Sequence, residues 1–195
     1  MGWGSLIWDP RALHLLETAT PWHTDGPELP VEFGRVSRDG RLTLVLVPGN
    51  GEATPLHILW AEMCCRDVEH ARMNLAAREC VERNIVGSIA VWPTDGKSVH
   101  HYAVVDRWAK NKGIDFVVWT ALRPRFEDRF GRMPSEAETL DYLRMLPAAG
   151  RAAAEEYIRR APPQVKTSYR LGIEKALGWT YDGSKTDSRI KLPPT

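Results

Sequence analysis

The stretch that decides the fold is the opening run Met1-Gly2-Trp3-Gly4-Ser5-Leu6-Ile7-Trp8. We expect a strand here, with no targeting segment ahead of it. Gly4 and Ser5 stand mid-run, where a regular strand favours side chains that pack. A glycine there permits a positive φ or the close approach of another group. Consecutive N–H groups would then form a concave nest for an anion such as a carboxylate. A simple bulge in an edge strand is the alternative.

Two familiar glycine motifs do not fit this run. The spacing Gly2-x-Gly4-x-x-Ile7 lacks the third glycine of the dinucleotide fingerprint, and Asp9-Pro10 follows where that motif requires a helix. The run also fails the Gly-x-Ser-x-Gly pattern of a hydrolase nucleophile elbow. The sequence therefore argues against both a Rossmann domain and an α/β-hydrolase.

The composition is that of a soluble globular chain, and it excludes several classes of partner. With 195 residues, 43% hydrophobic composition and a net charge of +1, the chain suits one domain with no strong pull toward nucleic acid or membrane. Three cysteines without a C-x-x-C pair favour a reducing cytoplasm. We expect no metal or cofactor, because the histidines and cysteines lack a trusted ligand spacing; these are His57, His70, Cys64 and Cys65. The oligomeric state cannot be predicted.

Hydrophobic periodicity predicts an α+β chain, with strands concentrated before residue 122 and helices after it. Asp39-Gly40 is a strong turn signal inside a hairpin expected over 29–47. Further strands are expected over 55–65, 85–92 and 116–122. Helices are expected over 68–79, 98–112, 136–145, 148–160 and 163–177, with a capping box at Ser135–Glu138. We divide the chain into one domain over 1–180, with a core over about 1–122 and a helical part over about 134–178, and an extended tail over 181–195.

Arg78-Glu79 at the end of the expected helix 68–79 is the most informative charged pair. The helix macrodipole disfavours an anion at this end. Glu79 is therefore either a solvated surface charge or a residue placed there for a function.

The order of these features resembles the gamma-glutamylcyclotransferase family. That family opens with a Tyr-Gly-Ser run, continues with a Phe-Gly…Ser and Gly-Gly-x-(Ala/Leu)-Thr hairpin, and closes a helix with (Arg/Gln)-Glu-Gly. This chain has Trp3-Gly4-Ser5-Leu6-Ile7-Trp8, similar to the opening of the ChaC-type glutathione-degrading branch, then Phe33-Gly34…Ser37…Gly40-Arg41-Leu42-Thr43-Leu44, then Arg78-Glu79. The resemblance covers about residues 1–92. Trp3 replaces the tyrosine, Cys80 replaces the glycine after the glutamate, and Gly40-Arg41 replaces Gly-Gly.

The resemblance implies a small mixed β-barrel of about five to seven strands flanked by helices. It implies a cytoplasmic enzyme that releases 5-oxoproline from a gamma-glutamyl amide without metal or cofactor, with Glu79 as the general acid and base. The opening residues would bind the substrate; these are Trp3, Gly4, Ser5 and Leu6. Arg35 and Ser37 share one face of the expected hairpin strand and would supplement carboxylate binding. The leaving amine is not specified.

Two other functions remain open from the sequence. The same fold would also serve as a non-catalytic module that binds a small molecule or a protein, with the C-terminal helices as its surface. The same site would also allow transfer of a gamma-glutamyl or related acyl group to a different amine. A buried Glu79 that faces an open pocket beside Ser5 favours the enzyme. A solvent-facing Glu79, or a pocket filled by Trp3, favours the module.

Overall fold

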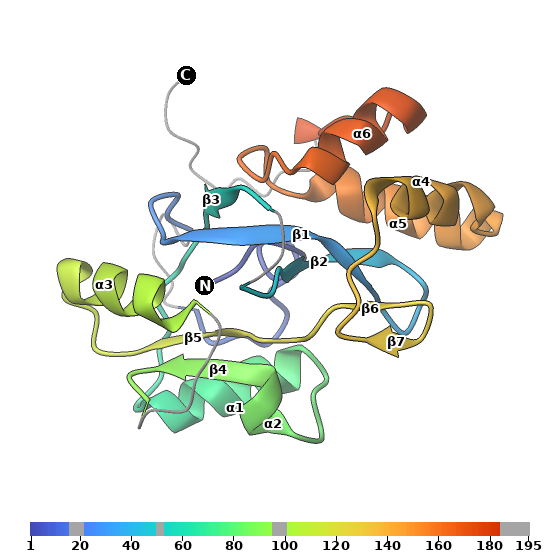
Figure 1. The fold of residues 1–195 in the computed structure, drawn as a ribbon. Coiled ribbons are helices and arrows are strands. Elements are labelled where there is room, and N and C mark those ends of the chain that lie inside the picture. Colours follow the sequence, from blue (N-terminus) through green and yellow to red (C-terminus); the bar gives the residue numbers. More distant parts are fainter. Residues whose placement is uncertain (16–21, 50–52, 95–100, 184–195) are drawn as a thin grey trace.

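The computed structural model describes residues 1–15, 22–49, 53–94 and 101–183, and the chain there forms two sheets and six helices (Figure 1). The first sheet contains β1 (Glu28–Val36), β2 (Leu42–Leu46), β3 (Pro55–His57), β6 (Arg125–Phe126) and β7 (Arg129–Phe130). The second contains β4 (Ile89–Trp92) and β5 (Val117–Thr120). The helices are α1 (Val68–Arg78), α2 (Ile85–Ser88), α3 (Tyr102–Lys112), α4 (Glu136–Met145), α5 (Ala148–Arg160) and α6 (Ser168–Leu177). The α+β class is confirmed.

The central strand of the first sheet is β1, which pairs with β2 in the predicted hairpin and also with β3 and β6. β1 and β2 pair antiparallel, and Gly40 in their turn has a φ of 81°, which explains the glycine there. The register slips between Phe33 and Arg35, so Gly34 sits at a bulge. A side chain on Gly34 would collide with Met133, which packs against the backbone at this point. The bulge sets where the end of β1 points its side chains.

The opening residues correct the first prediction. They form turns instead of a strand, because Gly4 O accepts from Ile7 N–H at 3.0 Å and Ser5 O accepts from Asp9 N–H at 2.8 Å. Only Gly2 pairs as a strand would, in a single bridge in which its N–H donates to Leu59 O at 2.8 Å.

The opening segment lies between the two sheets (Figure 1). Its Gly2 bridge reaches the chain that follows β3, and the amino group of Met1 donates to Val118 O of β5 at 2.9 Å. Neither sheet closes into a barrel within the described residues, which corrects the expected barrel.

Most of the predicted helices form where their sequence signals lie. Asp67 caps α1 by accepting from His70 N–H, and α4 and α5 have the predicted bounds. The Ser135–Glu138 capping box is present.

Other predicted boundaries need correction. The expected strand over 85–92 begins as the short helix α2, so only β4 is extended. The last helix begins at Ser168, not 163, because Thr167 caps it by accepting from Arg170 N–H. The hairpin of β6 and β7 was not predicted. Residues 98–100 of the expected helix over 98–112, and positions 184–195 of the expected tail, lie outside the described residues.

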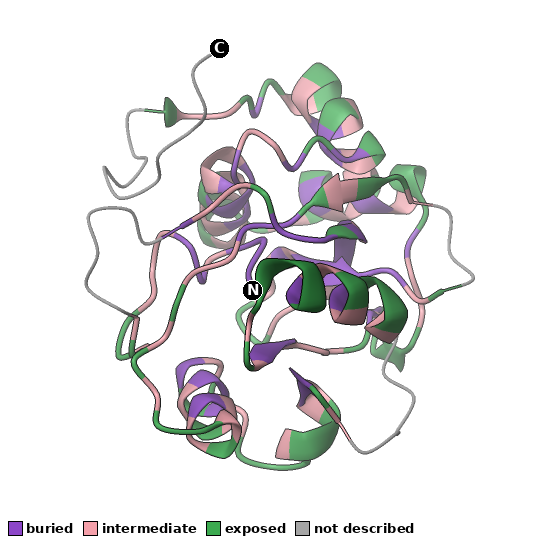
Figure 2. Ribbon diagram, turned by 90° about the vertical axis from the view of Figure 1, so that its left-hand side faces the viewer, coloured by how far each residue is buried: buried purple, intermediate pink, exposed green. Residues whose placement is uncertain are grey.

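Helices cover each sheet with their apolar faces, and Figure 2 shows buried residues along those faces. α1 packs on β4 and β5 through residues such as Ala71 and Leu75, which are fully or almost fully buried. α5 and α6 pack on β2 and β1 of the first sheet. This packing places the C-terminal end of α1 and the turn of the β1–β2 hairpin near the opening segment, and all three line one cavity.

None of the helices described is both long and apolar enough to cross a membrane.

Candidate active site

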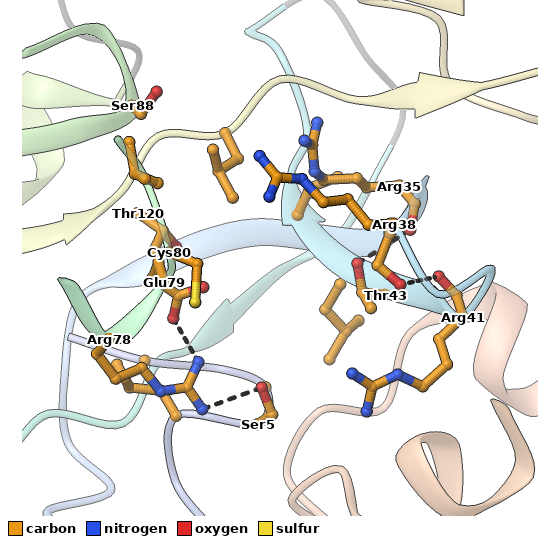
Figure 3. Close-up of a pocket in the computed structure, with 18 of the residues that line it drawn as sticks. Ser5, Arg35, Arg38, Arg41, Thr43, Arg78, Glu79, Cys80, Ser88 and Thr120 are labelled. Carbon is orange, nitrogen blue, oxygen red and sulfur yellow. Dashed lines mark hydrogen bonds and ion pairs between the residues drawn. The ribbon is translucent and has the colours of Figure 1, made fainter. Parts of the chain in front are cut away.

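A cavity of about 650 Å³ lies where the opening turns, the β1–β2 hairpin and the end of α1 meet (Figure 3). All the residues predicted for the site line it: Trp3, Gly4, Ser5, Leu6, Arg35, Ser37 and Glu79. Residues separated by more than seventy positions in the sequence are thus gathered around one space. The spatial condition for a joint site is met.

Glu79 is the last residue associated with α1, and it is held by its neighbour Arg78. The Arg78 Nη1 atom lies 2.6 Å from Glu79 Oε1, and the two side chains are only 4% and 18% exposed. Glu79 is therefore not a solvated surface charge. Its carboxylate faces the cavity with one oxygen fixed by a guanidinium (Figure 3).

Arg78 also ties α1 to the opening segment. Its Nη2 donates to Asp9 O at 2.7 Å and to Ser5 Oγ at 3.2 Å, and its Nε donates to Asp9 O at 3.2 Å. A planar guanidinium makes these bonds at once because its donors form a rigid fork. Arg78 is a positioning residue that sets the distance between Glu79 and Ser5.

The opening turn offers backbone donors to the cavity. Within the described part of the chain, the N–H groups of Gly4, Ser5 and Leu6 donate no hydrogen bond to protein, although the carbonyl groups of Gly4 and Ser5 are engaged. Consecutive free N–H groups of this kind suit a carboxylate. This agrees with the predicted nest, although Gly4 does not have a positive φ.

Tyr157 of α5 closes the cavity behind Gly4, and sequence reasoning missed it. A side chain at Gly4 would collide with the Tyr157 hydroxyl, so the glycine is needed for a close approach. The hydroxyl accepts from Leu44 N–H at 3.3 Å, so its own proton can be donated elsewhere. Burial raises the pKa of Tyr157 to about 12, which keeps it protonated at neutral pH.

Cys80, which follows Glu79, has a φ of 53°. This left-handed conformation favours glycine and ends many helices. The geometry explains why a glycine would be common after the glutamate at such a helix end. In this chain a cysteine takes the conformation and places an exposed thiol at the cavity rim.

The cavity wall is rich in arginine. Among the residues described, the cavity is lined by six arginines and three acidic residues. The arginines are Arg11, Arg35, Arg38, Arg41, Arg78 and Arg83, and the acidic residues are Asp39, Glu79 and Glu82. Arg35 and Arg38 lie across the cavity from Arg78 and Glu79 (Figure 3). Burial lowers the pKa of Arg35, and the neighbouring charges of Arg125 and Arg38 add to this. Neither Arg35 nor Arg38 pairs with a carboxylate among the residues described. The wall therefore suits an anion.

Two predicted binding residues have structural contacts of their own. Ser37 Oγ lies 2.5 Å from Asp39 Oδ1 and 2.9 Å from Arg41 O, so its hydroxyl belongs to the hairpin turn. Trp3 is 5% exposed and forms part of the core, and it does not fill the cavity that it lines.

No protein-family model, no curated protein and no solved structure matches the chain.

Proposed function

We propose that this chain is a gamma-glutamylcyclotransferase-like enzyme that releases 5-oxoproline from a gamma-glutamyl amide. One observation carries the proposal: the shielded Glu79 carboxylate and the open N–H groups of the opening turn line the same cavity. The opening segment pairs with the chain after β3 through Gly2 and donates to β5 through Met1, so it connects the two sheets beside this cavity.

The reaction needs little beyond positioning and proton transfer. The α-amine of the substrate attacks its own γ-carbonyl carbon, so a C–N bond of a five-membered ring forms while the amide C–N bond to the leaving amine breaks. Because nucleophile and carbonyl belong to one molecule, correct orientation alone corresponds to effective molarities on the order of 10⁵ M or more. The task of the protein is to fold the substrate and to carry protons from its α-nitrogen to the leaving nitrogen.

The opening turn would hold the glutamyl end. The N–H groups of Gly4, Ser5 and Leu6 would bind the α-carboxylate, which places the α-amine toward α1. Glu79 would take a proton from the α-ammonium group and deliver it to the leaving nitrogen, and it would then accept the second proton, which the ring nitrogen loses as the new amide forms. Arg78 holds one Glu79 oxygen, which leaves the other for this transfer.

Tyr157 is proposed as a donor to the developing oxyanion. Its hydroxyl lies against Gly4, lines the cavity and stays protonated at neutral pH. A neutral donor in a water-poor site stabilises negative charge that develops on the carbonyl oxygen. In this chain Trp3 stands where the family has a tyrosine, and Tyr157 would return a phenol hydroxyl to the same wall from a distant helix.

The arginine wall supports an anionic leaving group. Arg35 and Arg38 face the cavity opposite Glu79 without a carboxylate partner in the part of the chain described. A leaving amine that bears a carboxylate, such as an amino acid, would relieve their mutual repulsion. The proposal therefore favours gamma-glutamyl amino acids or peptides over uncharged gamma-glutamyl amines.

The test follows 5-oxoproline formation from a gamma-glutamyl amino acid. Wild type should be active, and Glu79→Gln should reduce kcat at least about 100-fold, because a general acid and base contributes this much. Glu82→Gln is the matched control, since Glu82 lines the same cavity but is exposed, and it should retain the wild-type rate. Full activity of Glu79→Gln would contradict the assigned role.

The same assay separates the two rival functions. Saturable binding of the substrate without any turnover by the wild type would identify the cavity as that of a binding module. Formation of a new gamma-glutamyl amide when a second amine is added, in place of 5-oxoproline, would identify acyl transfer to an external nucleophile. The 18% exposure of Glu79 and the open cavity beside Ser5 favour the cyclising enzyme.

A further inference from the structure

Outside the cavity, three side chains with metal-binding atoms come together. The donor atoms of His14, Cys65 and His70 all lie within 4.8 Å of one another. The imidazole rings of His14 and His70 meet edge to face, with centroids 5.5 Å apart. The residues come from the loop after Asp9, the segment that leads into α1, and the first turn of α1. The sequence did not indicate this cluster, because Cys65 and His70 are separated by four residues and His14 lies about fifty positions upstream, which is no familiar metal-binding spacing.

The backbone around the three residues is fixed by hydrogen bonds. The Asn74 amide on α1 accepts from His14 N–H at 2.8 Å and donates to Ala12 O at 3.0 Å. Cys64 N–H donates to His14 O at 2.8 Å, which holds the neighbouring Cys65 beside the loop. The third ligand is held by the helix cap, because His70 N–H donates to Asp67 Oδ1 at 2.7 Å. A site whose supporting contacts exist before binding needs only side-chain adjustment.

The donor set selects a class of metal. Two imidazoles and one thiolate suit Zn²⁺, which binds nitrogen at about 2.0–2.1 Å and sulfur at about 2.3 Å in a tetrahedron. In a tetrahedron those bond lengths place neighbouring donors about 3.3–3.6 Å apart. The observed limit of 4.8 Å is close enough for the side chains to close on an ion. Three protein ligands leave one position for water.

We propose that His14, Cys65 and His70 bind one Zn²⁺ ion with water as the fourth ligand. The ion would fasten the loop over 9–15 to the N-terminal turn of α1. Arg78 already fastens the start of this loop to the other end of the same helix, through Asp9 O. The metal would therefore brace the segment that connects the opening turn to α1. The proposal does not depend on the enzymatic function.

The first test is metal titration of the EDTA-treated chain with Zn²⁺ by calorimetry. We expect one ion per chain with micromolar or tighter affinity, and a rise in Tm with added zinc, because a ligand that binds only the folded state stabilises it. Cys65→Ser and His14→Ala should each weaken binding at least about tenfold. Cys64→Ser is the matched control, since this thiol is adjacent but exposed, and it should bind as wild type does.

A second test needs no substitution. Alkylation of the folded wild-type chain with iodoacetamide, followed by mass spectrometry, should show zinc slowing the modification of Cys65 but not of Cys64 or Cys80. Equal protection of the three thiols, or none, would overturn the proposal. So would failure to bind one zinc ion per chain, or zinc binding that survives both Cys65→Ser and His14→Ala.

Discussion

At the scale of the residue, the cavity depends on a glycine that admits a phenol. Gly4 has an ordinary backbone conformation, and its value lies in its missing side chain, because the Tyr157 hydroxyl occupies that space. The sequence left open whether this glycine serves a positive φ or the close approach of another group, and the structure shows the close approach. The sequence could not predict which group, because Tyr157 lies 153 positions downstream on a helix whose periodicity indicates only an apolar face.

Gly4→Ala should lower the free energy of unfolding by about 1–3 kcal/mol, since the added methyl group overpacks the site against Tyr157. Tyr157→Phe removes the hydroxyl oxygen and should make room for the added methyl group. The double variant Gly4→Ala with Tyr157→Phe is therefore expected to lose less stability than the sum of the two single changes, measured by chemical denaturation. Simple additivity would show that the two residues do not meet.

At the scale of the element, the end of α1 is where helix, loop and cavity join. The Asp67 cap and the apolar spacing of α1 predicted this helix, and Glu79 followed from its position at the helix end. The contacts of Arg78 to Asp9 O and Ser5 Oγ did not follow, because a helix end carries no information about which loop folds against it.

Arg78→Met should cost about 3 kcal/mol of stability, because it leaves the half-buried Glu79 carboxylate and Asp9 O without their donor. It should also reduce cyclisation by letting Glu79 move. Arg72→Met, on the same helix, removes only the pair with the exposed Glu69 and should cost less than about 1 kcal/mol. Equal losses in urea denaturation for the two variants would show that Arg78 makes no special contribution.

The capping box of α4 gives a pH-dependent stability. Hydrogen bonds from the Ser135 backbone, then the Arg132 guanidinium and the Ser135 hydroxyl, lower the pKa of Glu138 to about 2 from an ordinary value of 4.5. Because the pKa of Glu138 is lower in the folded state, its ionised carboxylate stabilises the fold above pH 4.5. This contribution is lost as the pH falls toward 2. The stability difference between wild type and Glu138→Gln should therefore shrink over that range in thermal unfolding. A difference independent of pH would contradict the ion-paired capping box.

At the scale of the whole molecule, the site lies where two sheets are joined by turns. Composition and periodicity predicted the α+β class and most helices, including α4 and α5 with their bounds. The barrel expectation assumed that the opening residues extend, but the local bonds from Ile7 N–H and Asp9 N–H fold them into turns. Periodicity is ambiguous over so short an apolar run, so the pattern alone did not reveal these turns.

The gathering of arginines at the cavity could not be predicted from the sequence either. A net charge of +1 gives no hint of an arginine-lined cavity, because acidic residues elsewhere balance the total. Folding gathers Arg35 and Arg38 across from Glu79, and this local positive charge would attract an anion. Folding likewise brings His14, Cys65 and His70 together beside α1 from separate parts of the sequence.

The central claim is that the opening turn binds the α-carboxylate of a gamma-glutamyl group while Glu79 contacts the α-amine of the same group. A crystal structure of the complex with 5-oxoproline tests it most directly. We predict that the product carboxylate accepts hydrogen bonds from the N–H groups of Gly4, Ser5 and Leu6, and that the ring N–H lies within hydrogen-bond distance of the Glu79 carboxylate. A product ring turned away from Glu79, or bound elsewhere on the protein, would contradict the account.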